Sequence, residues 1–318
     1  MRIVSLLPSA TEIVCALGLE DALVGVTHEC DYPAGVRELP VVTRSLLDHH
    51  DWPSDEIDHH VSRQLRDGLS LYELDSELLL ELRPDLILTQ SLCAVCAVSY
   101  GAVQRVVSDI TDIFAPVAPR VLTLEPGTLA DVLQTFVAVG AAAGVEQRAE
   151  RLVAEVQARI ERVRERVQQA RTRPRVAFLE WLDPAFGPGH WMPELVELAG
   201  GKPGLGRAGA ASRHVPWDDV IAFAPEVIVV APCGFGVQRA LKEAAEVLPR
   251  RHAWGALPAV RRGCVYVADG SAYFSRPGPR IAESLELLAE LVHPELCDGW
   301  GPAGAWQRLV PQAVVADT

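Results

Sequence analysis

A Cys-x-x-Cys pair is the feature of this sequence with the clearest capacity for chemistry. Cys93 and Cys96 come soon after one expected strand, and His28 and Cys30 come directly after another. If the two strands are neighbours in a sheet, all four side chains meet at its carboxyl edge. One histidine and three cysteines suit a tetrahedral Zn²⁺ or another thiophilic metal. The pattern allows a metal site, but a lone Cys-x-x-Cys equally fits small buried hydrophobic side chains.

Two Asp-His-His triplets also suggest metal binding. They lie at residues 48–50 and 58–60, among acidic and polar neighbours. Side chains in such surroundings are usually solvated, and we expect a loop there.

Aromatic and basic side chains gather in the segments that follow strands in the second half of the chain. His190 and Trp191 fit a pocket wall with a polar contact, and they fit a structural segment before a helix equally well. Tyr273, Phe274 and Arg276 can form a stacking wall with an anchor for a phosphate or an amide. The alternative is an aromatic loop packed on the sheet, with the arginine paired to a carboxylate.

The elements that position these residues alternate between short apolar strands and helices. A long amphipathic pattern over residues 146–172 predicts one helix between two such sets. Alternation of this kind predicts an α/β protein whose mainly parallel sheets are covered by helices. The expected divisions are an N-terminal lobe, a linker helix, a C-terminal lobe and a tail: 1–145, 146–172, 173–295 and 296–318.

Composition limits the class of protein. The chain has 318 residues, 49% of them hydrophobic, and a formal net charge of −13. This charge disfavours nucleic acid and anionic membranes as partners. No apolar run is long enough to span a bilayer.

Location is suggested by the cysteine count and the start of the chain. Seven cysteines, an odd number, spread along a long chain do not resemble a disulfide framework. No apolar stretch typical of a signal peptide follows Arg2. We therefore expect a cytoplasmic location, or a periplasmic one only if a signal peptide has been removed.

Conventional catalytic motifs are not found. The sequence has no Gly-x-Ser-x-Gly, no phosphate-binding loop, no His-Glu-x-x-His and no dinucleotide fingerprint. We expect a protein that is not an enzyme.

Several ordered motifs carry a resemblance to a known family. The chain resembles the substrate-binding proteins of cobalamin and iron-siderophore importers, the helical-backbone (class III) periplasmic-binding-protein type. The resemblance spans residues 2–292. The motifs are Ser5-Leu6-Leu7-Pro8-Ser9-Ala10-Thr11-Glu12, Val24-Gly25-Val26, Asp31-Tyr32-Pro33, Arg83-Pro84-Asp85-Leu86-Ile87-Leu88, Val215-Pro216-Trp217, Ala224-Pro225-Glu226-Val227-Ile228-Val229 and Pro279-Arg280-Ile281.

The resemblance is greatest to the cobalamin-binding branch. It implies two α/β lobes joined by one long backbone helix, with the ligand in a cleft between the lobes. It also implies aromatic ligand contacts at Tyr32, Phe186 and Trp217, and a cleft arginine at Arg276. A corrin is a broad, mostly apolar plate fringed with amides, so large rigid apolar surfaces suit it.

Docking to a membrane permease is a further implication of the resemblance. The family carries one acidic residue on each lobe for contact with permease arginines. Glu77 and Asp218 occupy roughly matching positions. An ABC permease is therefore one expected partner, and a cytosolic corrinoid-using protein is another.

Two departures from the transporter proteins separate this chain from them. Gln90, followed by the Cys93–Cys96 segment, stands where those proteins place an aromatic residue in the cleft. This pattern is similar to a cytosolic sub-branch that is loosely described as cobalamin-binding. The insert at residues 43–75 has no counterpart in the transporter proteins.

Three functional hypotheses remain open. The first is a soluble protein that binds cobalamin or a related corrinoid, with Cys93, Cys96 or His28 close to the cobalt. The second is a protein that binds haem or an iron-siderophore. Siderophores are usually anionic and favour several arginines, which are few here. The third is a cytosolic thiol protein that handles metal or exchanges disulfides through the two cysteines.

Overall fold

The computed structural model describes residues 1–47, 51–90 and 118–310. The chain divides into two compact units, and each includes segments distant in sequence. The first unit comprises Met1–Trp52, Glu56–Pro126 and Ala130–Glu155. The second comprises Pro53–Asp55, Gly127–Leu129 and Val156–Thr318.

The first unit is built on a four-stranded parallel sheet in the order β2-β1-β5-β6. Strands β1 and β5 are entirely buried, which explains why their sequences are nearly continuous apolar runs. Its core includes Val4, Leu79 and Ile87. The four strands are β1 (Ile3–Ser5), β2 (Leu23–Gly25), β5 (Leu86–Thr89) and β6 (Arg120–Thr123).

Helices α1 (Pro8–Ala16), α3 (Ser76–Leu82) and α5 (Leu129–Ala143) accompany this sheet. Proline begins α1, where its missing N–H costs no hydrogen bond. The carboxylate of Asp75 caps α3 by accepting a hydrogen bond from the Leu78 N–H at 2.9 Å. These local signals fix where the helices start after each strand.

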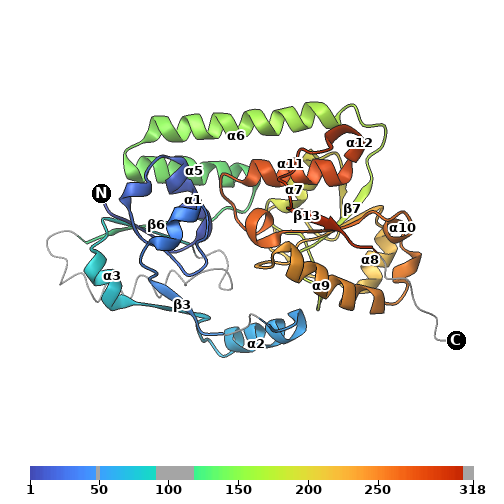
Figure 1. Ribbon diagram of the computed structural model, residues 1–318, viewed down its shortest axis with the longest axis horizontal. Helices are drawn as coiled ribbons and strands as arrows, with labels where there is room; N and C mark the ends of the chain where they lie inside the picture. Colours follow the sequence, from blue (N-terminus) through green and yellow to red (C-terminus); the bar gives the residue numbers. More distant parts are fainter. Residues whose placement is uncertain (48–50, 91–117, 311–318) are drawn as a thin grey trace. The chain divides into compact units, whose positions relative to one another are not determined.

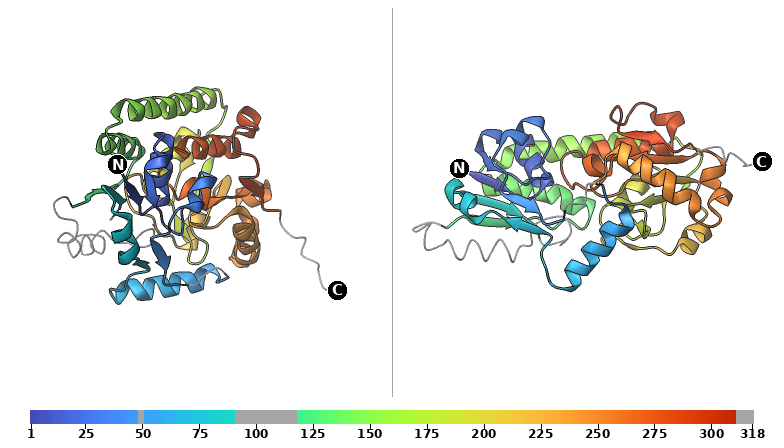
Figure 2. Two further views of the ribbon diagram at one scale, coloured as in Figure 1. Left: turned by 60° about the vertical axis from the view of Figure 1, so that its left-hand side comes forward. Right: turned by 60° about the horizontal axis from the view of Figure 1, so that its bottom comes forward.

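The insert forms a hairpin and a helix. Strands β3 (Thr43–Ser45) and β4 (Tyr72–Leu74) pair antiparallel, and α2 (Ser54–Arg66) lies between them in sequence. Figures 1 and 2 show α2 apart from the four-stranded sheet, at the end of this hairpin. The expectation of a loop at residues 58–60 is wrong, because these residues lie within α2. Residues 48–50 are outside the described part of the chain.

The second unit contains a five-stranded sheet in the order β13-β12-β11-β7-β9. Four strands are parallel, and β13 joins the edge antiparallel. Figure 1 shows α7 and α11 on one side of this sheet and α9 on the other. The strands are β7 (Arg175–Leu179), β9 (Lys202–Pro203), β11 (Val227–Val230), β12 (Val265–Ala268) and β13 (Trp306–Arg308).

The helices around this sheet follow its strands in sequence. Helices α9 and α11 are the longest, α7 and α8 have seven residues each, and α10 and α12 have four each. Their bounds are α7 (Met192–Leu198), α8 (Trp217–Phe223), α9 (Val237–Val247), α10 (Pro258–Arg261), α11 (Ile281–Val292) and α12 (Pro294–Cys297). A short antiparallel pair, β8 (Phe186–Gly187) and β10 (Arg213–His214), lies outside the main sheet.

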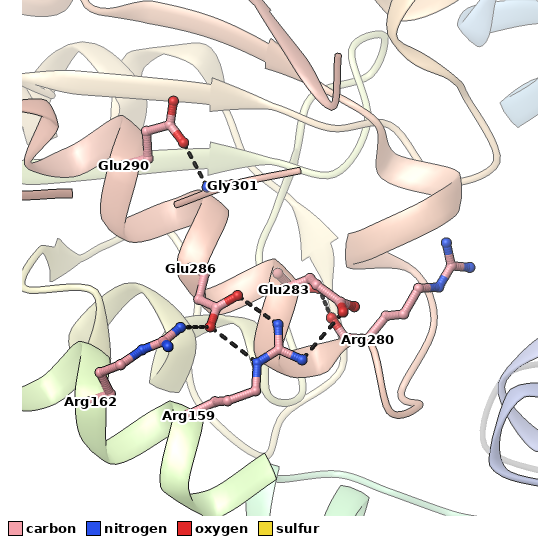
Figure 3. A network of polar contacts seen from close by, with 8 residues as sticks. Arg159, Arg162, Arg280, Glu283, Glu286, Glu290 and Gly301 are labelled. Atoms are coloured by element: carbon pink, nitrogen blue, oxygen red, sulfur yellow. Dashed lines mark hydrogen bonds and ion pairs between the residues drawn. The ribbon is translucent and has the colours of Figure 1, made fainter. Parts of the chain in front are cut away.

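The long helix α6 runs from Glu146 to Val167, shorter than the predicted 146–172. Its C-terminal part packs on α11 through an ion-pair network (Figure 3). Arg159 contacts the buried carboxylate of Glu286 through two nitrogens, at 3.1 and 2.6 Å, and Arg162 contacts it at 2.6 Å. These bonds raise the pKa of Arg159, so the guanidinium stays charged and holds α6 on α11.

The segment after α12 packs onto the second unit through aromatic and polar contacts. Glu290 on α11 accepts hydrogen bonds from the Gly301 N–H at 2.7 Å and from the Trp306 indole at 3.2 Å (Figure 3 shows the Gly301 contact). The Arg162 guanidinium lies 5.2 Å from the ring centroid of Trp300. Residues 300–308 are thus part of the folded unit.

Candidate functional site

The carboxyl ends of the parallel strands are where α/β sheets bind ligands. In the first unit this edge is lined by small polar side chains. We call Ser5, Thr11, Thr27, Cys30 and Thr89 the first-unit edge. All five are buried. Because β1, β2 and β5 are adjacent, the segments that follow them meet there.

Hydroxyl and thiol groups of the first-unit edge contact one another. The Thr11 hydroxyl donates to the Ser5 hydroxyl at 2.8 Å and lies 3.1 Å from the Cys30 sulfur. The Thr27 hydroxyl lies 3.3 Å from the same sulfur. The Thr89 hydroxyl is buried and has no hydrogen-bond partner among the described residues. The edge is therefore a compact polar layer.

His28 and Cys30 are directed to different partners. The His28 Nδ1 lies 2.8 Å from the Thr43 hydroxyl, and its ring lies 5.5 Å from that of Tyr72. Cys30 contacts the two threonines named above. Within the described residues, no three His, Cys, Asp or Glu side chains are placed to hold a metal ion.

The remaining candidates of the first unit occupy different environments. Gln90 is buried at the end of β5, while Cys93 and Cys96 lie outside the described residues. Tyr32 is 48% exposed, and Glu77 is exposed in the first turn of α3.

At the corresponding edge of the second unit, the half-buried carboxylate of Glu180 connects two loops through hydrogen bonds. Glu180 follows β7 and accepts hydrogen bonds from the Gly189 N–H, at 3.2 Å, and from the Ser212 hydroxyl. A Cβ on Gly189 would lie 2.2 Å from the Ser212 nitrogen, so only glycine permits this close approach. The loop after β7 is thus tied to the segment that contains β10. Phe186 is half-buried there, 6.3 Å from the His214 ring.

His190 and Trp191 end the same loop. His190 has a φ of 50°, and its N–H donates to the Ala210 carbonyl at 2.6 Å. Burial lowers the pKa of His190, so its imidazole is neutral near pH 7 and can accept a hydrogen bond or ligate a metal. Trp191 is buried, 5.8 Å from the His190 ring. Its indole N–H has no acceptor in the described part of the chain.

An aromatic cluster between β7 and β11 was not predicted from the sequence. The Trp181 and Phe235 rings meet edge to face at 5.2 Å, and the Arg239 guanidinium lies 3.7 Å from the Phe235 centroid. Cys233 is exposed in the same loop and donates its backbone N–H to the Glu180 carbonyl at 3.1 Å. The sequence did contain one indication of this cluster, because the loops with Trp181 and Phe235 both directly follow expected strands.

The turn after β12 separates the three residues predicted there. Phe274 is buried and packs on Phe178, with ring centroids 5.1 Å apart. Tyr273 is half-buried, with the Arg280 guanidinium 5.5 Å from its ring centroid. Arg276 is buried and donates to the Ser271 hydroxyl at 3.4 Å.

Trp217 and Asp218 begin α8. Trp217 is only 8% exposed, and its indole donates to the His252 carbonyl at 3.0 Å. Its ring lies 6.1 Å from that of Trp254. Asp218 is exposed and contacts the His252 imidazole at 2.8 Å.

We call Trp181, Phe186, His190, Phe235 and Tyr273 the second-unit edge. They lie in the segments that follow β7, β11 and β12, the three central neighbours of the sheet. This edge is aromatic where the first-unit edge is hydroxylic.

Comparison with known proteins identifies the class. Residues 3–272 match the family described as "Periplasmic binding protein", and the chain belongs to that family. It is therefore a substrate-binding protein of the ABC-transporter type, and members of this family are binding proteins rather than enzymes. The predicted fold of two lobes with mainly parallel sheets is confirmed.

Three relatives show the range of the family. An uncharacterized ABC transporter substrate-binding lipoprotein, YvrC of Bacillus subtilis, is 26% identical over 92% of this chain and 80% of its own length. The periplasmic haem-binding protein RhuT of Roseiflexus has a TM-score of 0.67 and 23% identity, covering 92% of this chain and 98% of that one. The periplasmic vitamin B12-binding protein BtuF of Vibrio cholerae has a TM-score of 0.63 and 21% identity, covering 92% and 96%.

The expectation of a cytoplasmic location is wrong. The chain belongs to the periplasmic binding protein family, and its relatives include a lipoprotein and periplasmic proteins. The expectation rested on the cysteine count and on the start of the chain, and neither feature is a property of the fold that defines the family. The cytosolic thiol-protein hypothesis and the zinc site have no support. In the described residues, no helix is long and apolar enough to cross a membrane.

Proposed function

We propose that this protein binds cobalamin or a related corrinoid and delivers it to an ABC permease. The observation that carries the proposal is the aromatic second-unit edge. Trp181 and Phe235 form an edge-to-face pair, and Phe186 and Tyr273 are half-buried in adjacent loops. Rigid rings of this kind offer wide apolar surface at little cost in conformational entropy, which suits a corrin plate.

Charge favours a corrinoid over an anionic chelate. The arginines near this edge are engaged with neighbouring groups: Arg239 on Phe235, Arg280 on Tyr273 and Arg276 on Ser271. The whole chain carries a net charge of −13. A siderophore or the propionates of haem would bring further negative charge, whereas the amide fringe of a corrin is neutral.

Polar side chains that could contact the corrin amides are proposed in each unit separately. The neutral His190 imidazole and the buried Trp191 indole N–H are suited to hydrogen-bond a ligand, since a buried donor without an acceptor is uncommon. In the first unit, Tyr32 and Gln90 are the candidates. We propose ligand contacts for these four residues.

Haem is the second candidate ligand. His190 favours it, because a neutral imidazole is a common axial ligand of haem iron. A haem-binding protein is also among the similar structures.

Docking to the permease is proposed at two exposed carboxylates. Glu77 lies in the first turn of α3 and Asp218 in the first turn of α8. Both are exposed, as contact with arginines of a partner requires. Asp218 already contacts the His252 imidazole, so docking would exchange this contact for one with a permease arginine.

A ligand titration tests the proposal. The purified protein is titrated separately with cyano-, hydroxo- and adenosylcobalamin and with haemin, followed by calorimetry and visible absorbance. We expect saturable binding of at least one cobalamin, weakened about tenfold or more in Trp181→Leu because the ring contact is lost. His252→Gln, at an exposed histidine away from these rings, is the control. Binding of haemin with no cobalamin binding would replace the corrinoid by haem, and binding of neither would refute both.

A further inference from the structure

The first residues of α2 and α5 belong to the second unit. Pro53–Asp55 and Gly127–Leu129 are both part of it, whereas the chain on either side of each segment belongs to the first unit. Helix α2 begins at Ser54 and α5 begins at Leu129. Both helices thus start from an anchor in the second unit.

A glutamate of the second unit caps each of these helix starts. The Ser54 N–H donates to the Glu243 carboxylate at 2.7 Å. The Leu129 N–H donates to the Glu194 carboxylate at 2.8 Å. The first N–H groups of a helix have no partner within the helix, and the helix dipole favours a negative charge there. The two anchors are therefore the same device used twice.

The anchor of α2 also contacts the loop that follows β7. Ser54 is fully buried. Its carbonyl accepts a hydrogen bond from the Trp181 indole at 3.1 Å, and its hydroxyl accepts one from the Asp183 N–H at 3.1 Å. A residue of the insert thus fixes the ring that the proposed site depends on.

Both capping glutamates follow loops of the second-unit edge. Glu194 lies in the first turn of α7, three residues after Trp191. Glu243 lies on α9, which begins directly after the loop that carries Phe235. A change in either loop can therefore reach a helix start through one carboxylate.

We propose that Glu194 and Glu243 are positioning residues. They clasp the starts of α5 and α2, hold the loops after β7 and β11 in place, and thereby slow the exchange of ligand. The part concerning ligand exchange rests on the proposed function.

Hydrogen exchange of the full-length protein without ligand tests the clasps directly. The variants are Glu243→Ala, Glu194→Ala and the double variant, with Glu→Gln at each site as the conservative change that keeps an oxygen acceptor. Glu246→Ala on α9 and Glu197→Ala on α7 are matched controls, because both are exposed. In the alanine variants we expect at least about tenfold faster exchange at residues 53–58 or 129–133 and in the loop 181–191, with the glutamine variants intermediate.

Ligand release is the second measurement. Release of the cobalamin that binds most tightly is followed by stopped-flow absorbance after mixing with an excess of a competing binder. We expect release to be about tenfold faster in the double variant and unchanged in the controls. Faster release with unchanged melting temperature in the glutamine variants would separate positioning from a loss of folding.

The outcomes distinguish the two proposals. If hydrogen exchange at residues 181–191 is unchanged in the double variant, the proposal that Glu194 and Glu243 position this loop is overturned. Faster exchange with unchanged ligand release overturns their role in ligand exchange. If the wild-type protein binds neither cobalamin nor haemin, the proposed function fails, and exchange of the two loops alone decides whether the clasps position them.

Discussion

The two sheet edges differ in chemistry although they occupy the same place in each unit's topology. The first-unit edge is a layer of buried hydroxyl and thiol groups that contact one another, as Thr11 does with Ser5 and Cys30. The second-unit edge presents aromatic rings, as in the Trp181–Phe235 pair. Small polar groups in mutual contact stabilise a unit, whereas half-buried rings also leave apolar surface for a ligand.

The comparison suggests a division of work between the units. In the second unit, loops carrying rings are held by Glu180 and by the start of α2. In the first unit, Tyr32 lies two residues after Cys30 and is 48% exposed. We therefore expect substitutions at the second-unit edge to change ligand binding and those at the first-unit edge to change stability.

Replacement of Trp217 should have the largest effect on stability. It also tests whether a ring outside both edges contributes to ligand binding. Trp217→Ala removes a buried ring and the bond from its indole to the His252 carbonyl. We expect the free energy of unfolding to fall by about 3–4 kcal/mol. Trp217→Phe, which keeps a ring, should cost about 1 kcal/mol. Urea unfolding monitored by circular dichroism measures both.

The resemblance to cobalamin-binding proteins implied a ligand contact at Trp217. If Trp217→Phe abolished cobalamin binding without a change in stability, the ring would act on the ligand despite its burial. Trp217 would then have to be counted among the ligand-contacting residues of the second-unit edge.

The next effect concerns the first-unit edge. Thr11→Val keeps the shape of the side chain but loses the hydroxyl that contacts Ser5 and Cys30. We expect a loss of about 1–2 kcal/mol in unfolding free energy and unchanged ligand affinity. Thr123→Val, in β6 of the same sheet and half-buried, is the control and should be close to neutral. A tenfold loss of affinity in Thr11→Val would contradict the division of work.

Strands were the part of the fold most open to prediction. Residues 227–230 and 265–267 are continuous apolar runs because β11 and β12 are buried on both faces. The end of α6 could not be placed, since Gln168 and Gln169 continue a helical pattern past Val167. Helix α2 was missed because its polar sequence resembles that of a loop.

The candidate site was predictable in its location but not in its contacts. The sequence places aromatic residues after strands, and Phe186 and Tyr273 are half-buried there. It does not show that Phe274 turns toward Phe178 in the core. Nor does it pair Trp181 with Phe235, because that contact depends on β7 lying beside β11.

His190 provides a smaller, pH-dependent test of the second-unit edge. Burial lowers its pKa below the usual 6.5, so the unfolded chain binds a proton more readily than the folded one. Its contribution to stability is complete above pH 6.5 and declines as the pH falls below that value. His190→Asn, which tolerates the φ of 50°, should therefore flatten the fall in stability between pH 7 and 5. His252→Gln is the control, and an equal flattening there would contradict the assignment.

The reactivity of cysteine thiols provides a further test of the difference between the two sheet edges, and it requires no substitution. Cys30 is buried at the first-unit edge, and burial raises the pKa of the nearby Cys15 to about 12, so Cys15 holds almost no thiolate at pH 8. Cys233 is exposed beside the second-unit edge. With iodoacetamide and peptide mapping by mass spectrometry, we expect Cys233 to be alkylated well before Cys15 and Cys30. Bound cobalamin should slow alkylation of Cys233 alone, because the ligand would cover that edge. Protection of Cys30 instead would place the ligand against the first unit and reverse the division of work.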